Sequence, residues 1–268
     1  MPGAEPFTHD GGRQGVLVLH GFTGSPQSMR MLAQALADEG TTVDLPLLPG
    51  HGTSLEDMLP TRWPDYTAAA DAALRRLARR CDAVALVALS MGGTLACWLA
   101  ERYPEIRGMA LVNPFVDPPA DSFRDVLRGL LEAGGEIAPG VGSDIAKDGV
   151  EELAYPGVPV AAALSLFAGI DDVAARLDYI ACPVLVLSSR NDHVVPSSSG
   201  DLLQAKVQGP VERVWLEHSY HVATLDYDAP LVRSRIVAFV RHVLGVGATG
   251  GDVAPGDASD GMVAGTAS

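Results

Sequence analysis

The stretch Ala88-Leu89-Ser90-Met91-Gly92-Gly93-Thr94-Leu95 follows a short apolar run, residues 83–87, and opens a helical pattern that ends before Pro104. This order predicts a strand, a tight turn and a helix, with Ser90 at the turn. The turn is close to Gly-x-Ser-x-Gly, with the small Ala88 in place of the first glycine. It lifts a serine clear of the backbone at a helix N-terminus, which favours a developing oxyanion. The alternative interpretation is a strand–helix turn with an incidental serine.

Apolar runs and helical patterns alternate on both sides of this turn. Buried strands are predicted at residues 15–20, 41–46, 83–87, 107–112, 183–187 and 211–216, and helices at residues 26–39, 63–80, 91–103 and 229–243. Ser25 is expected to cap the first of these helices. The alternation predicts an α/β fold, a mainly parallel sheet with helices on both faces.

The alternation also suggests how the chain is divided. Residues 1–14 are polar and are expected to form a flexible N-terminus, and residues 15–246 form the main domain. Residues 117–176 are too long for an ordinary connection and read as an inserted helical cap. Residues 247–268 consist mostly of Gly, Ala, Asp, Ser and Thr, so they are expected to be a disordered tail.

The composition excludes several classes of protein. The 268 residues include 19 basic and 33 acidic side chains, a formal net charge of −14, which disfavours nucleic-acid binding. Three isolated cysteines lack metal-like spacing and suit a reducing compartment. No secretory signal and no apolar run long enough to span a bilayer are visible, so a cytoplasmic location is expected.

A serine nucleophile needs a base to take its proton and a carboxylate to orient that base. His221 begins the segment before the last helix and is the preferred base, with His218 second. Asp192 lies just past a strand and is the preferred acid, with turn formation as its alternative role. The order Ser, Asp, His is that of α/β-hydrolases. The remaining histidines are interpreted as loop braces or as poorly placed: His9, His20, His51, His193 and His242.

Two backbone N–H groups are expected to form the oxyanion hole. Met91 N–H follows the nucleophile directly. The second is expected from the loop after the first apolar strand, where Phe22 follows His20-Gly21. Because the loops that hold Phe22, Ser90, Asp192 and His221 all follow strands, they should open on one edge of the sheet.

Five motifs together resemble the bacterial monoacylglycerol lipases and their relatives, the small carboxylesterases. The likeness covers about residues 15–245 and is carried by HGFTGSP at 20–26, LPGHGT at 48–53, LSMGGTL at 89–95, NDHVVP at 191–196 and SYHVATLDYD at 219–228. It implies an α/β-hydrolase that cleaves a monoacylglycerol to fatty acid and glycerol through an acyl-enzyme, without metal or cofactor. It supports Ser90, Asp192 and His221 as the triad and Phe22 and Met91 as the oxyanion donors.

The resemblance extends to the cap, where GSD at 142–144 and ELAY at 152–155 match the lipases. It implies that Glu152 binds the glycerol hydroxyls and that Val141 lines the same pocket. From the residues alone, Glu152 reads as a solvated glutamate like Glu151. The cap stretch 115–131 matches poorly and does not predict acyl-chain preference. Transient contact of the cap with lipid surfaces is a further hypothesis.

Four other functions compete with this one. A general carboxylesterase for short or medium-chain esters would use the same triad. A non-catalytic binding protein on a hydrolase scaffold would be expected to lack a triad member, and none is missing. A haloalkane dehalogenase or epoxide hydrolase needs aspartate at the position of Ser90. The sequence therefore favours a monoacylglycerol lipase, with the carboxylesterase as alternative.

Overall fold

The computed structural model describes residues 1–140 and 142–246. The predicted pocket residue Val141 and the predicted disordered tail, residues 247–268, lie outside the described residues.

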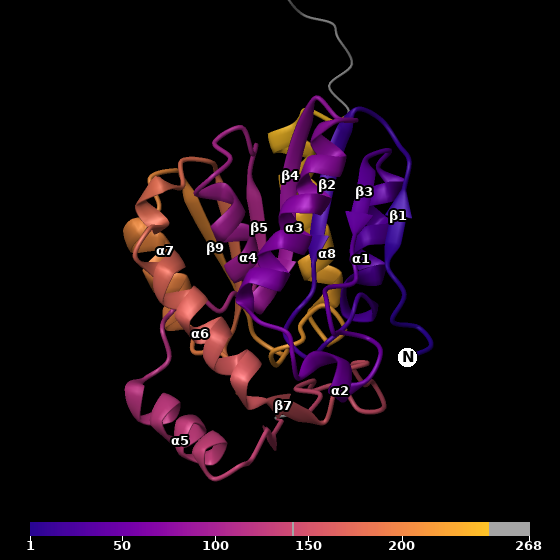
Figure 1. The fold of residues 1–268 in the computed structure, drawn as a ribbon. Helices are drawn as coiled ribbons and strands as arrows, with labels where there is room; N and C mark the ends of the chain where they lie inside the picture. Colours follow the sequence, from indigo (N-terminus) through magenta and orange to yellow (C-terminus); the bar gives the residue numbers. More distant parts are fainter. Residues whose placement is uncertain (141, 247–268) are drawn as a thin grey trace, which may run out of the picture.

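The described chain is built on a seven-stranded sheet of order β1-β3-β2-β4-β5-β8-β9 (Figure 1). All neighbouring strands are parallel except β1, which pairs antiparallel with β3. The predicted mainly parallel sheet is therefore confirmed. The strands are β1 (Phe7–His9), β2 (Gln14–Leu19), β3 (Thr42–Leu45), β4 (Ala83–Leu89), β5 (Met109–Val112), β8 (Val184–Ser189) and β9 (Val211–Leu216).

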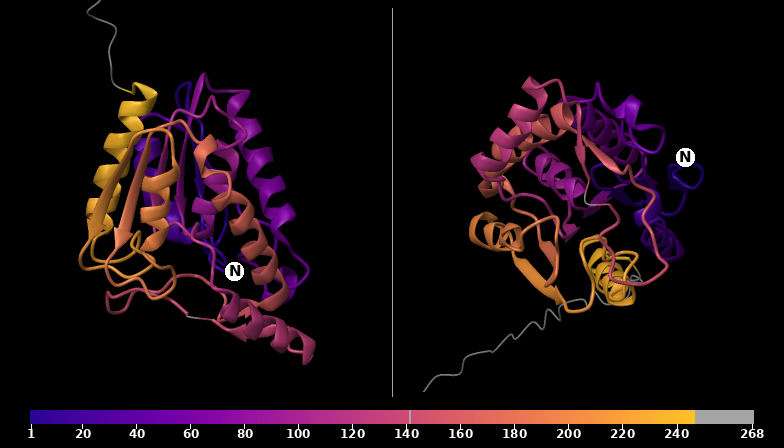
Figure 2. Two further views of the ribbon diagram at one scale, coloured as in Figure 1. Left: turned by 90° about the vertical axis from the view of Figure 1, so that its left-hand side faces the viewer. Right: turned by 90° about the horizontal axis from the view of Figure 1, so that it is seen from below.

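Helices cover both faces of this sheet (Figure 2). The helices α1 and α8 pack on one face, and α3, α4 and α6 pack on the other. The left panel of Figure 2 shows the sheet between yellow α8 and the purple helices of the opposite face. The bounds are α1 (Gln27–Asp38), α2 (Leu55–Met58), α3 (Trp63–Ala78), α4 (Met91–Ala100), α5 (Asp121–Glu132), α6 (Val160–Ala174), η1 (Leu177–Tyr179), α7 (Ser198–Lys206) and α8 (Ala229–Leu244).

The apolar runs build two cores because successive side chains of a strand point to opposite faces. In β2, Val16 and Val18 belong to the core under α1 and α8, while Leu17 and Leu19 belong to the core under α3, α4 and α6. All four side chains are fully buried. A strand buried on both faces reads as a continuous apolar run, which is why these strands are visible in the sequence.

The insertion between β5 and β8 contains α5, a small antiparallel sheet of β6 (Ile137–Pro139) and β7 (Gly157–Pro159), then α6 and η1. Its second helix, α6, packs against α3 and α4. Figure 1 shows α5 and β7 at the lower end of the molecule, below the sheet.

Two local expectations differ from the structure, and one helix is present that the sequence does not predict. Residues Phe7–His9 form β1 rather than a loose N-terminus, because their backbone pairs with β3. Ser25 does not cap α1: the N-cap is Pro26, and Ser28 Oγ donates to the Ser25 carbonyl at 3.0 Å. Helix α7, whose sequence has little apolar periodicity, was not predicted.

Candidate active site

Ser90 forms the turn between β4 and α4 in a strained conformation. Its φ of 55° and ψ of −121° lie outside the regions that non-glycine residues prefer. Ser90 N–H donates to the Val112 carbonyl at 3.0 Å, which ties the turn to the neighbouring strand β5. The predicted strand–turn–helix is therefore present, with Ser90 at its apex and 7% exposed.

Glycines make room for this turn beside the end of β2. A Cβ atom on Gly92 would lie 2.4 Å from the Leu19 carbonyl oxygen, closer than atoms can approach. A Cβ atom on Gly21 would lie 3.4 Å from Ser90 Cβ and 3.9 Å from its Oγ. The Ser90 turn and the loop after β2 are therefore in contact, and Gly92 is needed for its lack of a side chain.

His221 and Asp192 form a buried pair at the ends of β9 and β8. His221 Nδ1 lies 2.8 Å from Asp192 Oδ2, and the two side chains are 9% and 4% exposed. The other carboxylate oxygen of Asp192 accepts the N–H groups of Val194 and Val195, each at 2.8 Å. A carboxylate beside Nδ1 requires a proton there, so Nε2 is left as an acceptor and can serve as a base.

The other histidines have different partners. His20 is fully buried: its Nδ1 donates to the Gly21 carbonyl at 2.9 Å and its Nε2 accepts Leu48 N–H at 3.2 Å. Burial and the neighbouring His51 lower the pKa of His20 to about 3, so it braces the loops as a neutral ring. His218, the second choice for the base, is exposed, whereas His221 has the buried acid partner.

The two predicted oxyanion donors belong to the adjoining turns. Met91 is the first residue of α4, where backbone N–H groups have no acceptor within the helix. Phe22 follows Gly21, whose position against Ser90 brings the loop after β2 to the same place. Among the described residues, neither amide makes a backbone hydrogen bond outside the helices and strands. Both are available to a developing oxyanion.

Glu152 places its carboxylate on the same edge of the sheet. Its Oε1 lies only 2.6 Å from where a Cβ atom of Gly24 would be, in the loop after Phe22. Burial raises the pKa of Glu152, while the nearby His221 and the Ser28 hydroxyl act to lower it. The Glu152 side chain is half-buried, and its carboxylate lies near the loop after Phe22 and near His221.

Two interactions hold the Glu152 segment on the main domain. Leu153 N–H donates to the side-chain oxygen of Gln27 on α1 at 3.1 Å. Tyr155 Oη accepts Thr53 N–H and donates to the Gly50 carbonyl, both at 2.9 Å. The motifs at 48–53 and 152–155 therefore meet in space.

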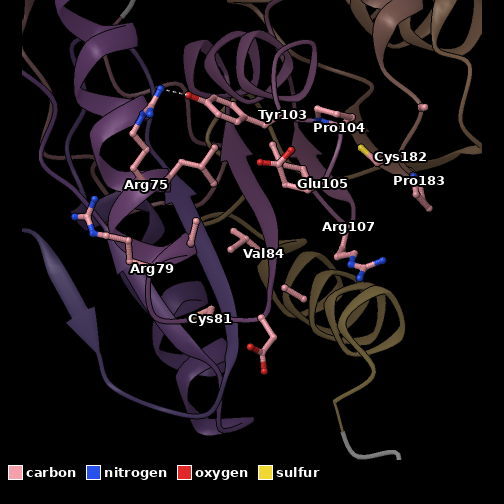
Figure 3. Close-up of a pocket in the computed structure, with 16 residues that line it drawn as sticks. Arg75, Arg79, Cys81, Val84, Tyr103, Pro104, Glu105, Arg107, Cys182 and Pro183 are labelled. Atoms are coloured by element: carbon pink, nitrogen blue, oxygen red, sulfur yellow. Dashed lines mark hydrogen bonds between the residues drawn. The ribbon is translucent and has the colours of Figure 1, made fainter.

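A groove of about 920 Å³ lies at the other end of the sheet (Figure 3). It opens around Ala83 at the start of β4, whereas Ser90 follows the end of the same strand. Arg75, Tyr103 and Arg107 line it, with a hydrogen bond from Arg75 to Tyr103 Oη at 2.6 Å. Seven strand residues place this groove about 20 Å from Ser90, so it is not the substrate site of the serine.

Three buried aspartates around the base were given no role by the sequence. Asp144, Asp226 and Asp228 accept backbone N–H groups of the loop that carries His221. For two of them the sequence offers a signal, the pair of aspartates in Asp226-Tyr227-Asp228 within the motif at 219–228. In residues 1–140 and 142–246, no group of three or more His, Cys, Asp or Glu side chains is arranged to hold a metal ion.

Comparisons with known proteins show the family of this chain. Residues 12–228 match the family model described as "Serine aminopeptidase, S33". The chain is 43% identical over 243 residues to the thermostable monoacylglycerol lipase of Bacillus sp. (strain H-257), covering 89% of this chain and 95% of that one. It is 28% identical over 242 residues to a carboxylesterase of Bacillus subtilis (strain 168), covering 89% and 97%.

Solved structures of lipolytic enzymes also resemble this chain. A structure of the metagenome-derived lipolytic enzymes LipS and LipT is 43% identical, with a TM-score of 0.86, over 90% of this chain and 99% of that one. A soluble variant of monoglyceride lipase from Saccharomyces cerevisiae has a TM-score of 0.73 at 14% identity, over 88% of each chain. At that identity the likeness supports the fold alone.

Proposed function

This chain belongs to the hydrolase family described as "Serine aminopeptidase, S33", and on that premise we propose that it cleaves monoacylglycerols to a fatty acid and glycerol. It is a carboxylic ester hydrolase, like the 43% identical lipase. The observation that carries the choice of substrate is the Glu152 carboxylate beside Gly24 and His221. An ionised carboxylate accepts hydrogen bonds only, which suits the free hydroxyls of a monoacylglycerol.

We propose that Ser90, Asp192 and His221 act as the triad. His221 Nε2 takes the Ser90 proton as Oγ attacks the ester carbonyl carbon. The oxyanion that forms accepts hydrogen bonds from the N–H groups of Phe22 and Met91. The C–O bond to glycerol then breaks, and His221 returns the proton to the leaving alkoxide. Water, deprotonated by the same nitrogen, attacks the acyl-enzyme. The bond between the acyl carbon and Ser90 Oγ breaks, His221 returns the proton to Oγ, and the fatty acid leaves, while Asp192 stabilises the imidazolium at each step.

Substitution of Glu152 tests whether the enzyme recognises the glycerol part of its substrate. We expect Glu152→Leu to lower kcat/KM for 1-decanoylglycerol by about 10-fold or more, because hydrogen bonds to a charged group contribute about 1.5–3 kcal/mol. Activity on methyl decanoate, which has no free hydroxyl, should change little. Because both substrates use the same triad, the ratio of the two kcat/KM values isolates recognition of glycerol.

Glu151→Leu is the matched control, since Glu151 precedes Glu152 and is exposed. It should leave the ratio unchanged. Equal losses on both substrates in Glu152→Leu, or no loss on either, would favour a general carboxylesterase, the activity of the 28% identical relative. Val141, proposed from the resemblance to line the same pocket, is tested by Val141→Ala with the same two esters.

We also propose that the insertion acts as a cap whose helix α5 contacts lipid surfaces. Phe123, Val126 and Leu131 expose 51%, 67% and 38% of their surface along α5. Leu127 and Arg124 are buried on its inner side. An amphipathic helix of this kind binds at the boundary of a lipid phase, where monoacylglycerols are found. Because the chain has a net charge of −14, neutral lipids fit better than anionic ones.

Binding to phosphatidylcholine vesicles tests the lipid contact. The double variant Phe123→Ser, Val126→Ser should cosediment less than the parent chain and should hydrolyse dispersed substrate more slowly. Its activity on a dissolved short-chain ester should be unchanged. Equal cosedimentation of the two proteins would contradict a role for α5.

No helix in the described ranges combines the length and the apolar content needed to cross a bilayer. We further propose a cytoplasmic location. It is supported by the three cysteines, which are all free and of which Cys81 and Cys97 are buried. Cell fractionation with an antibody to the protein tests the location, and recovery from the culture medium would contradict it.

A further inference from the structure

The backbone N–H groups of the loop that carries His221 donate to carboxylates instead of making helix or strand hydrogen bonds, while Asn113 and Ser189 donate to its carbonyls. Asp228 Oδ2 accepts the N–H groups of His218 and Ser219, each at 2.9 Å. Asp226 Oδ2 accepts Tyr220 N–H at 2.8 Å. Asp144 Oδ2 accepts the N–H of His221 itself at 3.0 Å. Each of these four consecutive amides therefore donates to an aspartate.

Asp144 differs from the other two aspartates because it comes from the insertion and also reaches the acid loop. Its Oδ2 accepts the backbone N–H of His193 at 3.2 Å, and its Oδ1 lies 2.8 Å from His193 Nδ1. His193 directly follows Asp192. The Asp144 carbonyl in addition accepts Val222 N–H at 3.1 Å. The Asp144 carboxylate thus binds the residue that follows the acid and the backbone N–H of the base itself.

The side chain of Asp144 is only 8% exposed, and its hydrogen bond to the N–H of His221 is buried, whereas the His193 ring is 55% exposed. Hydrogen bonds between N–H groups and a buried carboxylate are stronger than those between neutral groups. Asp144 therefore holds the backbones of His221 and His193 together, independently of the 2.8 Å contact between the His221 and Asp192 side chains. Such support matters because a misplacement of about 1 Å can lower the rate of an enzyme about 100-fold.

We propose that Asp144 is a positioning residue, which sets His221 against Asp192 and makes the alignment of the triad depend on the insertion. This inference rests on the triad proposed above. Asp144 touches neither the substrate nor the reacting atoms; it acts through the backbone of His221 and through His193.

The alternative is that Asp144 simply fastens the insertion to the main domain. Asp226 provides the comparison, since it fastens the same stretch of chain. Its carboxylate accepts Ala146 N–H at 2.7 Å and Lys147 N–H at 3.0 Å, in addition to Tyr220 N–H. It is bonded neither to His193 nor to His221 in the described structure. If fastening were the only role, loss of either carboxylate would have the same result.

The experiment compares Asp144→Ala and Asp144→Asn with Asp226→Asn, using p-nitrophenyl decanoate. We expect Asp144→Ala to lower kcat about 100-fold with KM within about twofold, because the triad is misaligned while the acyl pocket is intact. Asp144→Asn keeps one acceptor oxygen and should recover about 10-fold of that loss. Asp226→Asn should keep kcat within about threefold, although its melting temperature falls as much as that of Asp144→Asn.

Equal effects of Asp144→Asn and Asp226→Asn on kcat would overturn the proposal, and so would an Asp144→Ala enzyme with parental kcat. If Asp144→Ala does not fold, the two isosteric asparagine variants decide alone. His221→Ala separates this inference from the proposed function. An active His221→Ala enzyme overturns the triad and the role of Asp144 together, whereas an inactive one beside a fully active Asp144→Ala enzyme overturns only the latter.

Discussion

The turn at Ser90 and the loop at His221 meet at one edge of the sheet but are built in opposite ways. The Ser90 turn is fixed by a central strand, a helix and the absence of side chains at Gly21 and Gly92. The His221 loop has no regular structure and is fixed by the presence of buried carboxylates. A turn made of regular elements should be destabilised when an atom is added, and the loop should be destabilised when a buried carboxylate is removed.

The largest expected effect is on the rate of ester hydrolysis, when the Ser90 hydroxyl is removed from the turn. Ser90→Ala removes only a hydroxyl and should leave the melting temperature close to that of the parent. The rate of ester hydrolysis should fall by about 10⁶-fold, as in a comparable serine hydrolase. Steady-state kinetics on 1-decanoylglycerol with a folded variant is the measurement, and appreciable turnover would show that Ser90 is not the nucleophile.

The next largest effect is expected from the acid that orients the base His221. Asp192→Asn preserves the size of the side chain but presents an amide to His221 Nδ1, which favours the wrong tautomer. By analogy with other triads, kcat should fall by about 10⁴-fold. His218→Ala, in the loop that carries His221, is the control and should have nearly parental kcat, because His218 is exposed. A larger loss in His218→Ala than in Asp192→Asn would mean that the base has been misassigned.

Adding a methyl group tests the turn. Gly92→Ala would place Cβ 2.4 Å from the Leu19 carbonyl oxygen, so the turn or β2 must shift. Overpacking of this kind costs about 1–3 kcal/mol in stability. Gly129→Ala on α5 is the matched control, since a Cβ there meets no atom within 4 Å. Urea denaturation should show a loss for the first variant and none for the second; equal stabilities would contradict the close approach.

The last effect, which varies with pH, is expected at the far end of the Ser90 helix, where another buried carboxylate lies beside two arginines. Glu101 has a fully buried side chain and lies beside Arg102 and Arg176, but among the described residues its Oε1 has no hydrogen-bond partner. Burial raises the pKa of Glu101 from 4.5 to about 7, against the opposing effect of the two arginines. The folded protein therefore binds a proton over a pH range in which the unfolded chain has lost it.

The stability that this proton contributes is present below about pH 4.5 and is lost as the pH rises through about 7. Glu101→Gln mimics the protonated form at every pH. Its free energy of unfolding relative to the parent should rise by up to about 3 kcal/mol between about pH 5 and pH 9. The exposed Glu105→Gln is the control. A difference that does not vary with pH would show that Glu101 ionises normally.

The two regions also differ in how far they could be predicted. The Ser90 turn is encoded locally, by an apolar run, small residues and a helical pattern within about 20 residues, so the sequence places it correctly. The same holds for β2, β4 and β8, which are buried on both faces and read as continuous apolar runs. Convergence at one edge then follows from parallel strands.

The support that Asp144 gives to the loop of His221 could not be predicted, because it joins residues far apart in the chain. Asp144 lies 77 residues before His221, and nothing in Gly142-Ser143-Asp144 indicates that its carboxylate is buried. Strand β1 was missed for a similar reason: Phe7–His9 is short and is defined by its pairing with β3. Glu152 reads as a surface residue until the fold brings it against Gly24.

The central claim is that this hydrolase works through an acyl-enzyme on Ser90, aligned by the buried pair of Asp192 and His221. Peptide mass spectrometry after treatment with a fluorophosphonate tests it most directly. The account predicts one phosphonyl group per chain, on the peptide that contains Ser90, with labelling slowed in Asp192→Asn and absent in Ser90→Ala. Labelling of a different residue, or none in an enzyme that hydrolyses 1-decanoylglycerol, would contradict it.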